Sequence, residues 1–217
     1  MQFKTKIRDH TGSTSATAGY TTDTISDDRA SRFIVDGCYD VYKKYKSIKG
    51  FDETQKFGIW SDPAITNGTA IDVDEIHEIV YVQRNAIPAT MVSPNLLNKY
   101  TDVDSIHYAS VSDPVYYFQE QYMTIKPAPA GDGHAYYIYL PAYAVTTYDG
   151  TSSIDKFPTE YYDHVLIYAS IKCLEDLMHN YIEDEEDSEL AQLIGQRIDR
   201  LKVQYNEMFG VQQQQWN

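Results

Sequence analysis

The chain has 217 residues, of which 32 are acidic and 18 are basic, so its formal net charge at pH 7 is -14. This length can bury a proper core, and it predicts one domain or one domain with an inserted sheet module. The negative charge repels a polyanion and therefore argues against nucleic-acid binding driven by backbone phosphates, so DNA could pass the protein without adhering to it.

No stretch approaches the roughly 20 apolar residues that a membrane span needs. The first 20 residues lack the apolar segment of a signal peptide. We therefore expect a soluble protein that is made in the cytoplasm and has no membrane partner.

The two ends of the chain are predicted to be extended arms. Residues 1–23 include a run of Thr, Ser, Gly and Ala at 11–19, with too few apolar groups to fold alone. Residues 210–217 form a polar tail of four consecutive glutamines followed by Trp216. We expect both segments to become ordered only against a neighbouring molecule.

A first helix is predicted within residues 24–50. Ser26 is a good N-cap, Asp27 and Asp28 suit the positive end of the helix dipole, and Gly50 ends the element. Apolar side chains recur at three- and four-residue steps between these signals. They are Ala30, Phe33, Ile34, Cys38, Val41, Tyr42 and Tyr45.

Residues 51–155 are predicted to form an inserted β module, because the apolar period changes from about 3.6 to two. Strands are expected at 57–60, 76–84, 116–118, 122–126 and 135–144. Asn67-Gly68, Ser93-Pro94 and the Pro- and Gly-rich run at 127–133 provide the turns between them.

Two further helices are predicted within residues 156–209. Pro158 opens the first, an acidic link at 183–187 follows it, and a second apolar stripe runs from Leu190 to Met208. With the N-terminal helix they make a three-helix bundle. The predicted fold is therefore α+β, with a three-helix bundle, an inserted antiparallel β-sheet module and extended terminal arms.

The sequence contains 20 tyrosines but only 7 phenylalanines and 2 tryptophans. Tyrosine joins an apolar ring to a polar tip, which suits a surface that is wet in the monomer and buried after assembly. Tyrosines that simply cover a sheet explain the same count equally well. Cys38 and Cys173 lie on predicted helix faces without metal-type spacing, so we expect small buried apolar groups in a reducing compartment.

Known catalytic and metal-binding motifs are missing from the sequence. The six histidines show no His-x-x-x-His spacing, and His77-Glu78 is followed by Tyr81 where a zinc-protease signature needs its second histidine. The acidic clusters lack the glycine and closing glutamate of a calcium loop. There is no nucleophile elbow, phosphate-binding loop or dinucleotide fingerprint. The sequence therefore predicts no enzyme, no catalytic residue, no metal and no cofactor, although paired carboxylates brought together only by folding remain an open alternative.

Four stretches carry a resemblance to a known family. They are DPVYYF at 113–118, YMTIKP at 122–127, AYYIYLPA at 135–142, and FPTEY at 157–161 followed by VLIYA at 165–169. In this order they resemble the neck proteins of tailed bacteriophages, specifically the head-to-tail adaptor, also called the connector. IVDGCYDVY at 34–42 and the segment 201–205 are similar to the first and last helices of that family, so the resemblance covers about residues 24–209.

The resemblance implies a structural protein of the virion neck that is made in the host cytoplasm. Its partners would be sister copies in a dodecameric ring, the portal protein above and a tail or nozzle protein below, with DNA passing through the channel without specific binding. The longer N-terminal arm and the Gln-Trp tail depart from the family, so the way in which this chain grips its neighbours stays open.

We expect the arm or the tail to dock on the portal or on an adjacent subunit. The candidate partner-binding residues are Phe3, Tyr20, Gln214, Gln215 and Trp216, of which Trp216 is the expected anchor. The alternative is a tail-associated carbohydrate- or receptor-binding module whose sheet tyrosines stack on sugars. A glycan-cleaving enzyme is a third and more remote hypothesis.

Overall fold

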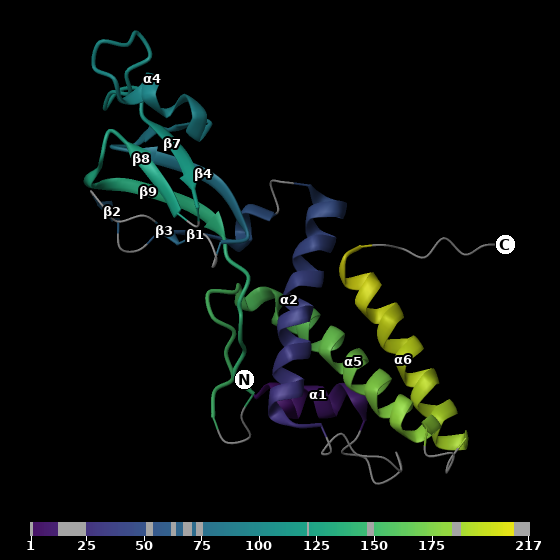
Figure 1. Ribbon diagram of the computed structural model, residues 1–217. Coiled ribbons are helices and arrows are strands. Elements are labelled where there is room, and N and C mark those ends of the chain that lie inside the picture. The colour runs from purple at the N-terminus through teal and green to yellow at the C-terminus, as the bar shows by residue number, and fades with distance from the viewer. Residues whose placement is uncertain are drawn as a thin grey trace, which may run out of the picture. The chain divides into compact units, whose positions relative to one another are not determined.

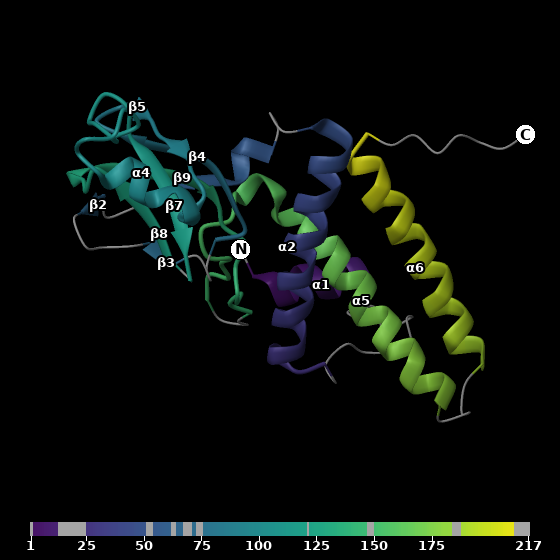
Figure 2. The same ribbon diagram turned by 45° about the horizontal axis from the view of Figure 1, so that its top comes forward.

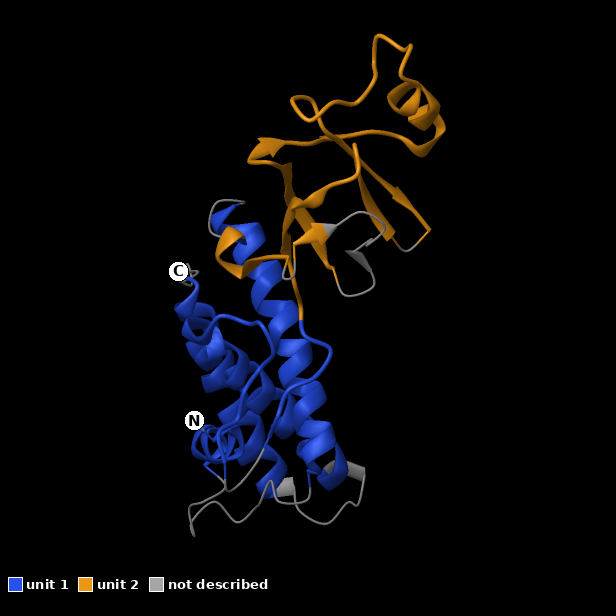
Figure 3. Cartoon of the chain, turned by 90° about the vertical axis from the view of Figure 1, so that its left-hand side faces the viewer, with its two compact units in different colours: residues 1–54, 141–217 blue, residues 55–140 orange. Residues whose placement is uncertain are grey.

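The computed structural model describes residues 2–12, 25–50, 54–61, 64–66, 71–72, 76–120, 122–146, 150–183 and 188–210. The chain divides into two compact units, coloured separately in Figure 3. The helical unit comprises residues 1–54 and 141–217, and the β unit comprises residues 55–140. The predicted α+β fold, in which sheets are inserted between N-terminal and C-terminal helices, is confirmed.

The helical unit is organised around one central helix. Its elements are α1 (Phe3–Thr11), α2 (Asp27–Lys49), the 3-10 turn η3 (Thr159–Tyr161), α5 (Tyr162–Glu183) and α6 (Ser188–Met208). Helix α5 packs against α1, α2 and α6, and Figures 1 and 2 show α6 running along it. A helix with neighbours on several sides must be apolar nearly all round. The buried residues of α5 include Val165, Leu166, Ile167, Ala169, Ile171, Cys173, Leu174 and Leu177.

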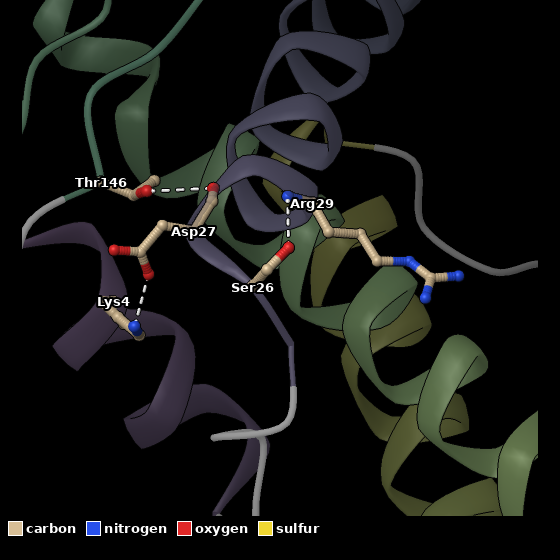
Figure 4. A network of polar contacts seen from close by, with 5 residues as sticks. All are labelled: Lys4, Ser26, Asp27, Arg29 and Thr146. Atoms are coloured by element: carbon tan, nitrogen blue, oxygen red, sulfur yellow. Dashed lines mark hydrogen bonds and ion pairs between the residues drawn. The ribbon is translucent and has the colours of Figure 1, made fainter.

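The start of α2 carries the capping signals that the sequence predicts. The Ser26 side chain accepts a hydrogen bond from the backbone N–H of Arg29 at 3.3 Å, and Asp27 and Asp28 occupy the first turn. Figure 4 shows that Asp27 also joins two other segments. Its carboxylate pairs with Lys4 of α1, and its backbone carbonyl accepts a hydrogen bond from the Thr146 hydroxyl at 3.2 Å.

The N-terminal segment differs from the flexible arm expected over residues 1–23. Phe3–Thr11 forms helix α1, which packs on α5 through Phe3, Ile7 and Thr11. Both ends of α1 are anchored by polar contacts, since the backbone N–H of Phe3 donates to the Ser152 hydroxyl at 3.0 Å and Arg197 Nε donates to the His10 carbonyl at 2.8 Å. Among the described residues, the bundle therefore has four helices, whereas the sequence predicted three.

Residues 141–158 belong to the helical unit, although the β module was expected to extend to residue 155. Ser31 of α2 donates its hydroxyl hydrogen to the Ala144 carbonyl at 2.5 Å and accepts from the Ala144 N–H at 3.2 Å. The Tyr162 hydroxyl accepts from the Ile154 N–H at 3.1 Å. These hydrogen bonds to helix side chains satisfy the extended backbone together with an isolated antiparallel β-bridge between Ala144 and Ile154.

The described residues of the β unit form two sheets. The first has the order β1 (Gly58–Trp60), β9 (Ala130–Ile138), β4 (Glu78–Arg84), β5 (Ile87–Pro88), and β2 (Ile65–Thr66) also pairs with β9. The second has the order β3 (Ile71–Asp72), β8 (Tyr122–Lys126), β7 (Val115–Gln119), β6 (Thr90–Met91). The strand pairs are antiparallel except β6 with β7, which is parallel. The short elements η1 (Gln55–Phe57), η2 (Pro94–Leu96) and α4 (Leu97–Thr101) complete the unit.

Apolar side chains cover both faces of the second sheet. Met123 and Ile125 of β8 pack against Val82 of β4 and Ala135 of β9, which forms a core between the two sheets. On β7, Tyr116 and Phe118 pack on this core, while Val115 and Tyr117 point to the opposite face of the sheet, as the two-residue period of a strand requires. Val115 and Tyr117 join Val92 and Ala109 in a second cluster, packed against Leu97 and Tyr100 around α4.

Strand β9 is shifted from its predicted position at 135–144. It begins at Ala130, where β2 supplies hydrogen-bonding partners through the Ile65–Gly133 and Thr66–Ala130 pairs. It ends at Ile138, shortly before Pro141, which has no N–H to donate to a ladder. The strand therefore covers part of the expected Pro- and Gly-rich turn and leaves Tyr143 outside the sheet.

Candidate interaction surfaces

The sequence-predicted partner residues fall into two groups. Phe3 is fully buried, with its ring 5.4 Å from the Tyr162 ring in an edge-to-face arrangement. It is part of the core of the helical unit in this conformation, so it offers no surface to a partner. Tyr20, Gln214, Gln215 and Trp216 lie outside the described residues.

The described residues contain no group of three His, Cys, Asp or Glu side chains placed to hold a metal ion. No helix among them is long and apolar enough to cross a membrane. Both cysteines are free thiols and buried, which confirms the expected burial. Burial raises the pKa of both thiols, and that of Cys173 reaches about 12, so neither thiol ionises near neutral pH.

One loop of the β unit exposes several large apolar side chains. We call it the apolar tip: residues 96–111, which comprise the end of η2, α4 and the loop that follows α4 in Figure 1. Ile106 is 95% exposed and Val103 is 72% exposed. Its exposed apolar side chains are Leu96, Val103, Ile106, Tyr108 and Val111. Single exposed apolar residues are ordinary, but several of them on one short, ordered segment favour an interaction site.

The apolar tip is held in shape by its own hydrogen bonds. The Asp102 carboxylate accepts from the Asp104 N–H at 3.0 Å, and the Ser105 hydroxyl accepts from the His107 N–H at 3.1 Å. The Ala109 N–H donates to the Tyr100 carbonyl at 2.9 Å, which closes the loop over the second core cluster. These turns fix Ile106 outward before any partner arrives, so little conformational entropy is lost on docking.

A second surface lies on the outer face of the first sheet. We call it the aromatic row: Trp60 of β1, Tyr81 of β4, and His134 and Tyr136 of β9. The centroid of the Trp60 ring lies 5.1 Å from that of Tyr136, 6.1 Å from that of Tyr81 and 6.3 Å from that of His134. Trp60 is directly opposite Tyr136 in the strand register and is 48% exposed.

Gly58 sets the position of the aromatic row. A Cβ atom at this residue would lie 2.4 Å from Cζ of Tyr136, so only glycine lets the tyrosine ring lie across β1. The Tyr136 hydroxyl donates to the Gln55 carbonyl at 2.5 Å, which fixes the far end of the ring. Trp60 thus stands beside a ring that is already held in place.

The helical unit has a groove of about 290 Å³ between α2, α5 and α6, which we call the lysine groove. Tyr168, Ile171 and Tyr205 supply apolar surface to it, and Lys44, Lys172 and Lys202 bring three positive charges. The remaining lining residues are Asp40, Glu175 and Asn206. In a chain with a net charge of -14, this is a local excess of positive charge.

Each lysine of the lysine groove is paired with an acidic residue: Glu175 binds two of them, and Asp40 pairs with Lys44 at 3.5 Å. Glu175 accepts from Lys172 at 2.9 Å and from Lys202 at 3.0 Å. Burial alone would raise the pKa of Glu175, but the hydrogen bonds from the two lysines outweigh it and hold that pKa below its ordinary value. The same Glu175 hydrogen bond raises the pKa of Lys172. Lys172 and Glu175 therefore both stay charged at neutral pH.

Asp40 also contacts Tyr205, whose aromatic ring lines the groove. The Tyr205 hydroxyl donates to the Asp40 carboxylate at 2.6 Å, and Lys44 Nζ lies 3.9 Å from the centroid of the Tyr205 ring. Burial, together with the Asp40 hydrogen bond, raises the pKa of Tyr205 well above its ordinary value. Tyr205 is thus a fixed neutral donor, and the ring gives the lysine a cation–π contact.

Sequence reasoning missed the apolar tip because it has neither the period of a helix nor that of a strand. The available signal was a set of large apolar residues, Val103, Ile106, Tyr108 and Val111, interleaved with Asp and Ser in a segment with no assigned element. No protein-family model matches the sequence, and no curated protein matches it either.

Proposed function

We propose that this chain is a head-to-tail adaptor of a tailed bacteriophage, a structural protein that forms a ring beneath the portal and connects it to the tail. The observation that carries the proposal is the apolar tip. An ordered loop that holds Ile106 at 95% exposure gains stability only when another protein covers it. The order of the four sequence stretches from 113 to 169 supports the specific type of assembly.

The charge of the chain supports the same role. Each copy brings a net charge of -14, so a ring of many copies would surround its channel with negative potential. DNA phosphates are repelled by such a wall and slide past it without adhering. The helical unit, with its core around α5, supplies a rigid body that can be repeated around a ring.

Electron microscopy of the purified chain, with and without purified portal rings, tests this proposal. We expect rings, or arcs of rings, that bind one face of the portal. A variant lacking residues 210–217 tests the tail as the anchor, and Trp216→Ala is its single-residue counterpart; we expect both to bind the portal more weakly. A chain that stays monomeric and leaves portals bare under all conditions would contradict the adaptor function.

The aromatic row favours a second candidate function, a carbohydrate-binding module. Aromatic faces stack on sugar rings, and Tyr136 is already held in place by Gly58 and Gln55. Saccharides that bind there would change the fluorescence of Trp60, and Trp60→Phe would abolish the change while Trp216→Phe would preserve it. Silence of the wild-type monomer toward a panel of bacterial surface glycans would exclude this candidate.

A further inference from the structure

We propose that the apolar tip of one copy docks in the lysine groove of the next copy. This contact deepens the proposed function, because it rests on a ring of sister copies and names the two surfaces that build it. The tip belongs to the β unit and the groove to the helical unit, so the contact joins two different surfaces of identical chains.

The first argument is the match in apolar surface. Val103 and Ile106 of the tip are exposed to solvent, and the turns at Asp102 and Ser105 hold them in this position. The groove offers about 290 Å³ with tyrosine and isoleucine surface along it. That volume accommodates one or two aliphatic side chains, and a central apolar anchor in a pocket is the usual core of an interface.

The second argument is the match in charge. The apolar tip carries two aspartates, Asp102 and Asp104, against a single lysine, Lys99, and Asp113 follows shortly after it. The groove carries three lysines against one aspartate and one glutamate. Opposite charges around an apolar centre steer two surfaces together and set their register.

The third argument concerns symmetry. A contact between two different patches of the same chain is heterologous, and repeating it generates either a closed ring or an open filament. A contact between two identical patches would end at a dimer. A tip-to-groove contact is therefore of the kind that an adaptor ring requires.

Substituting the centre of the tip tests the contact. We expect Ile106→Asp to raise the concentration at which copies associate by about tenfold or more, because the new carboxylate would have to be buried. Ile106 is almost fully exposed in the single chain, so the variant should fold normally. The matched control is Leu193→Asp on α6, which also replaces an exposed aliphatic residue but lies outside the groove. Sedimentation analysis across a range of protein concentrations measures both.

A mixing experiment distinguishes this contact from other modes of association. Lys202→Glu removes one lysine of the groove and repels the aspartates of the tip, so this variant keeps a working tip but loses its groove. Ile106→Asp keeps a working groove but loses its tip. We expect each variant alone to be monomeric, and the mixture to form pairs with one copy of each and nothing larger. Native mass spectrometry identifies the mixed pairs when one of the two variants is labelled with 15N, because the substitutions alone leave the two chains nearly equal in mass.

The outcomes separate this inference from the proposed function. Rings of Ile106→Asp that form at the wild-type concentration would overturn the tip-to-groove contact and leave the adaptor function standing. A wild-type chain that stays monomeric at the highest concentration, or a mixture that forms no pairs, would also overturn the contact. The binding of single copies to the portal then tests the adaptor function by itself.

Discussion

The two units of this chain differ in how completely they bury their apolar residues. The helical unit places its large side chains around α5, which has helices packed on several sides. The β unit places part of its core in two small clusters, and among the described residues it leaves more large apolar side chains exposed, including Trp60, Met91, Val103 and Ile106. A folded protein tolerates an exposed apolar surface only if the surface is small in area or if another molecule covers that surface.

This difference separates two tasks within one sequence. Continuous burial along long helices gives the helical unit a cooperative core, because each turn of α5 supports the next. Short strands and turns give the β unit less burial per residue but allow shaped, exposed surfaces on ordered backbone. We infer that the helical unit supplies most of the stability and that the β unit supplies most of the contacts with other molecules.

The largest expected effect is on the core of the helical unit. Leu174 of α5 is fully buried, so Leu174→Ala should lower the free energy of unfolding of this unit by about 2–5 kcal/mol through lost burial and the cavity left behind. Leu193→Ala, at a position that is 54% exposed, should change it by less than about 0.5 kcal/mol. Hydrogen exchange of the amides in α2 and α6 measures the effect. An equal loss of protection in β4 and β9 would break the comparison, because the two units would then unfold together.

Two glycine substitutions, one in each unit, sharpen the comparison because they should change stability in opposite directions. Gly58→Ala forces the Tyr136 ring away from β1, and we expect the β unit to lose about 1–3 kcal/mol of stability. Gly195→Ala on α6 places its methyl group in open space, and it should stabilise the helical unit by about 0.5–1 kcal/mol because alanine favours a helix. Thermal unfolding reports both changes. Unaltered Trp60 fluorescence in Gly58→Ala would show that the aromatic row does not depend on this glycine.

Much of this fold could be predicted from the sequence where local signals and tertiary packing agree. Ser26, Asp27 and the apolar stripe place the start of α2 within one residue of where it lies. Helix α1 was missed because its buried face consists of Phe3, Ile7 and Thr11, of which only two are apolar, and the helix gains stability by docking on α5. A helix of this length leaves too little periodic signal beside a run of Thr and Ser.

The candidate surfaces could be predicted far less well. The aromatic row depends on a bulge between Ile79 and Tyr81 and on Gly58, and neither feature has a distinct pattern in the sequence. The lysine groove combines side chains of α2, such as Lys44, with side chains of α5 and α6, which lie more than a hundred residues later in the chain. Proximity of this kind follows from packing geometry, which leaves no pattern in the sequence. The sequence therefore predicted partner-binding residues at the two ends of the chain and not in this groove.

The smallest expected effect is a difference between the two units in how their stability depends on pH. Burial lowers the pKa of His10 and of His164 in the helical unit below the ordinary value of 6.5. Below pH 6.5 these histidines bind protons more readily in the unfolded chain than in the folded unit. The stability of the helical unit therefore falls as the pH drops below 6.5. In the β unit, the Ala130 N–H, with help from Arg84, holds the pKa of Asp132 below 3.8. The stability that this carboxylate contributes is fully present above that value and is lost only in stronger acid.

Between about pH 7.5 and pH 5, the helical unit should thus lose stability while the Asp132 contribution to the β unit stays constant. Urea unfolding followed by hydrogen exchange in α5 and in β9 measures the two units in one sample. Nε2 of His10 is buried without a hydrogen-bond partner among the described residues, so His10→Gln should reduce the slope for the helical unit. A slope that is the same in both units, or one that His10→Gln leaves unchanged, would mean that buried histidines do not set the acid response and that the units are more alike than their packing indicates.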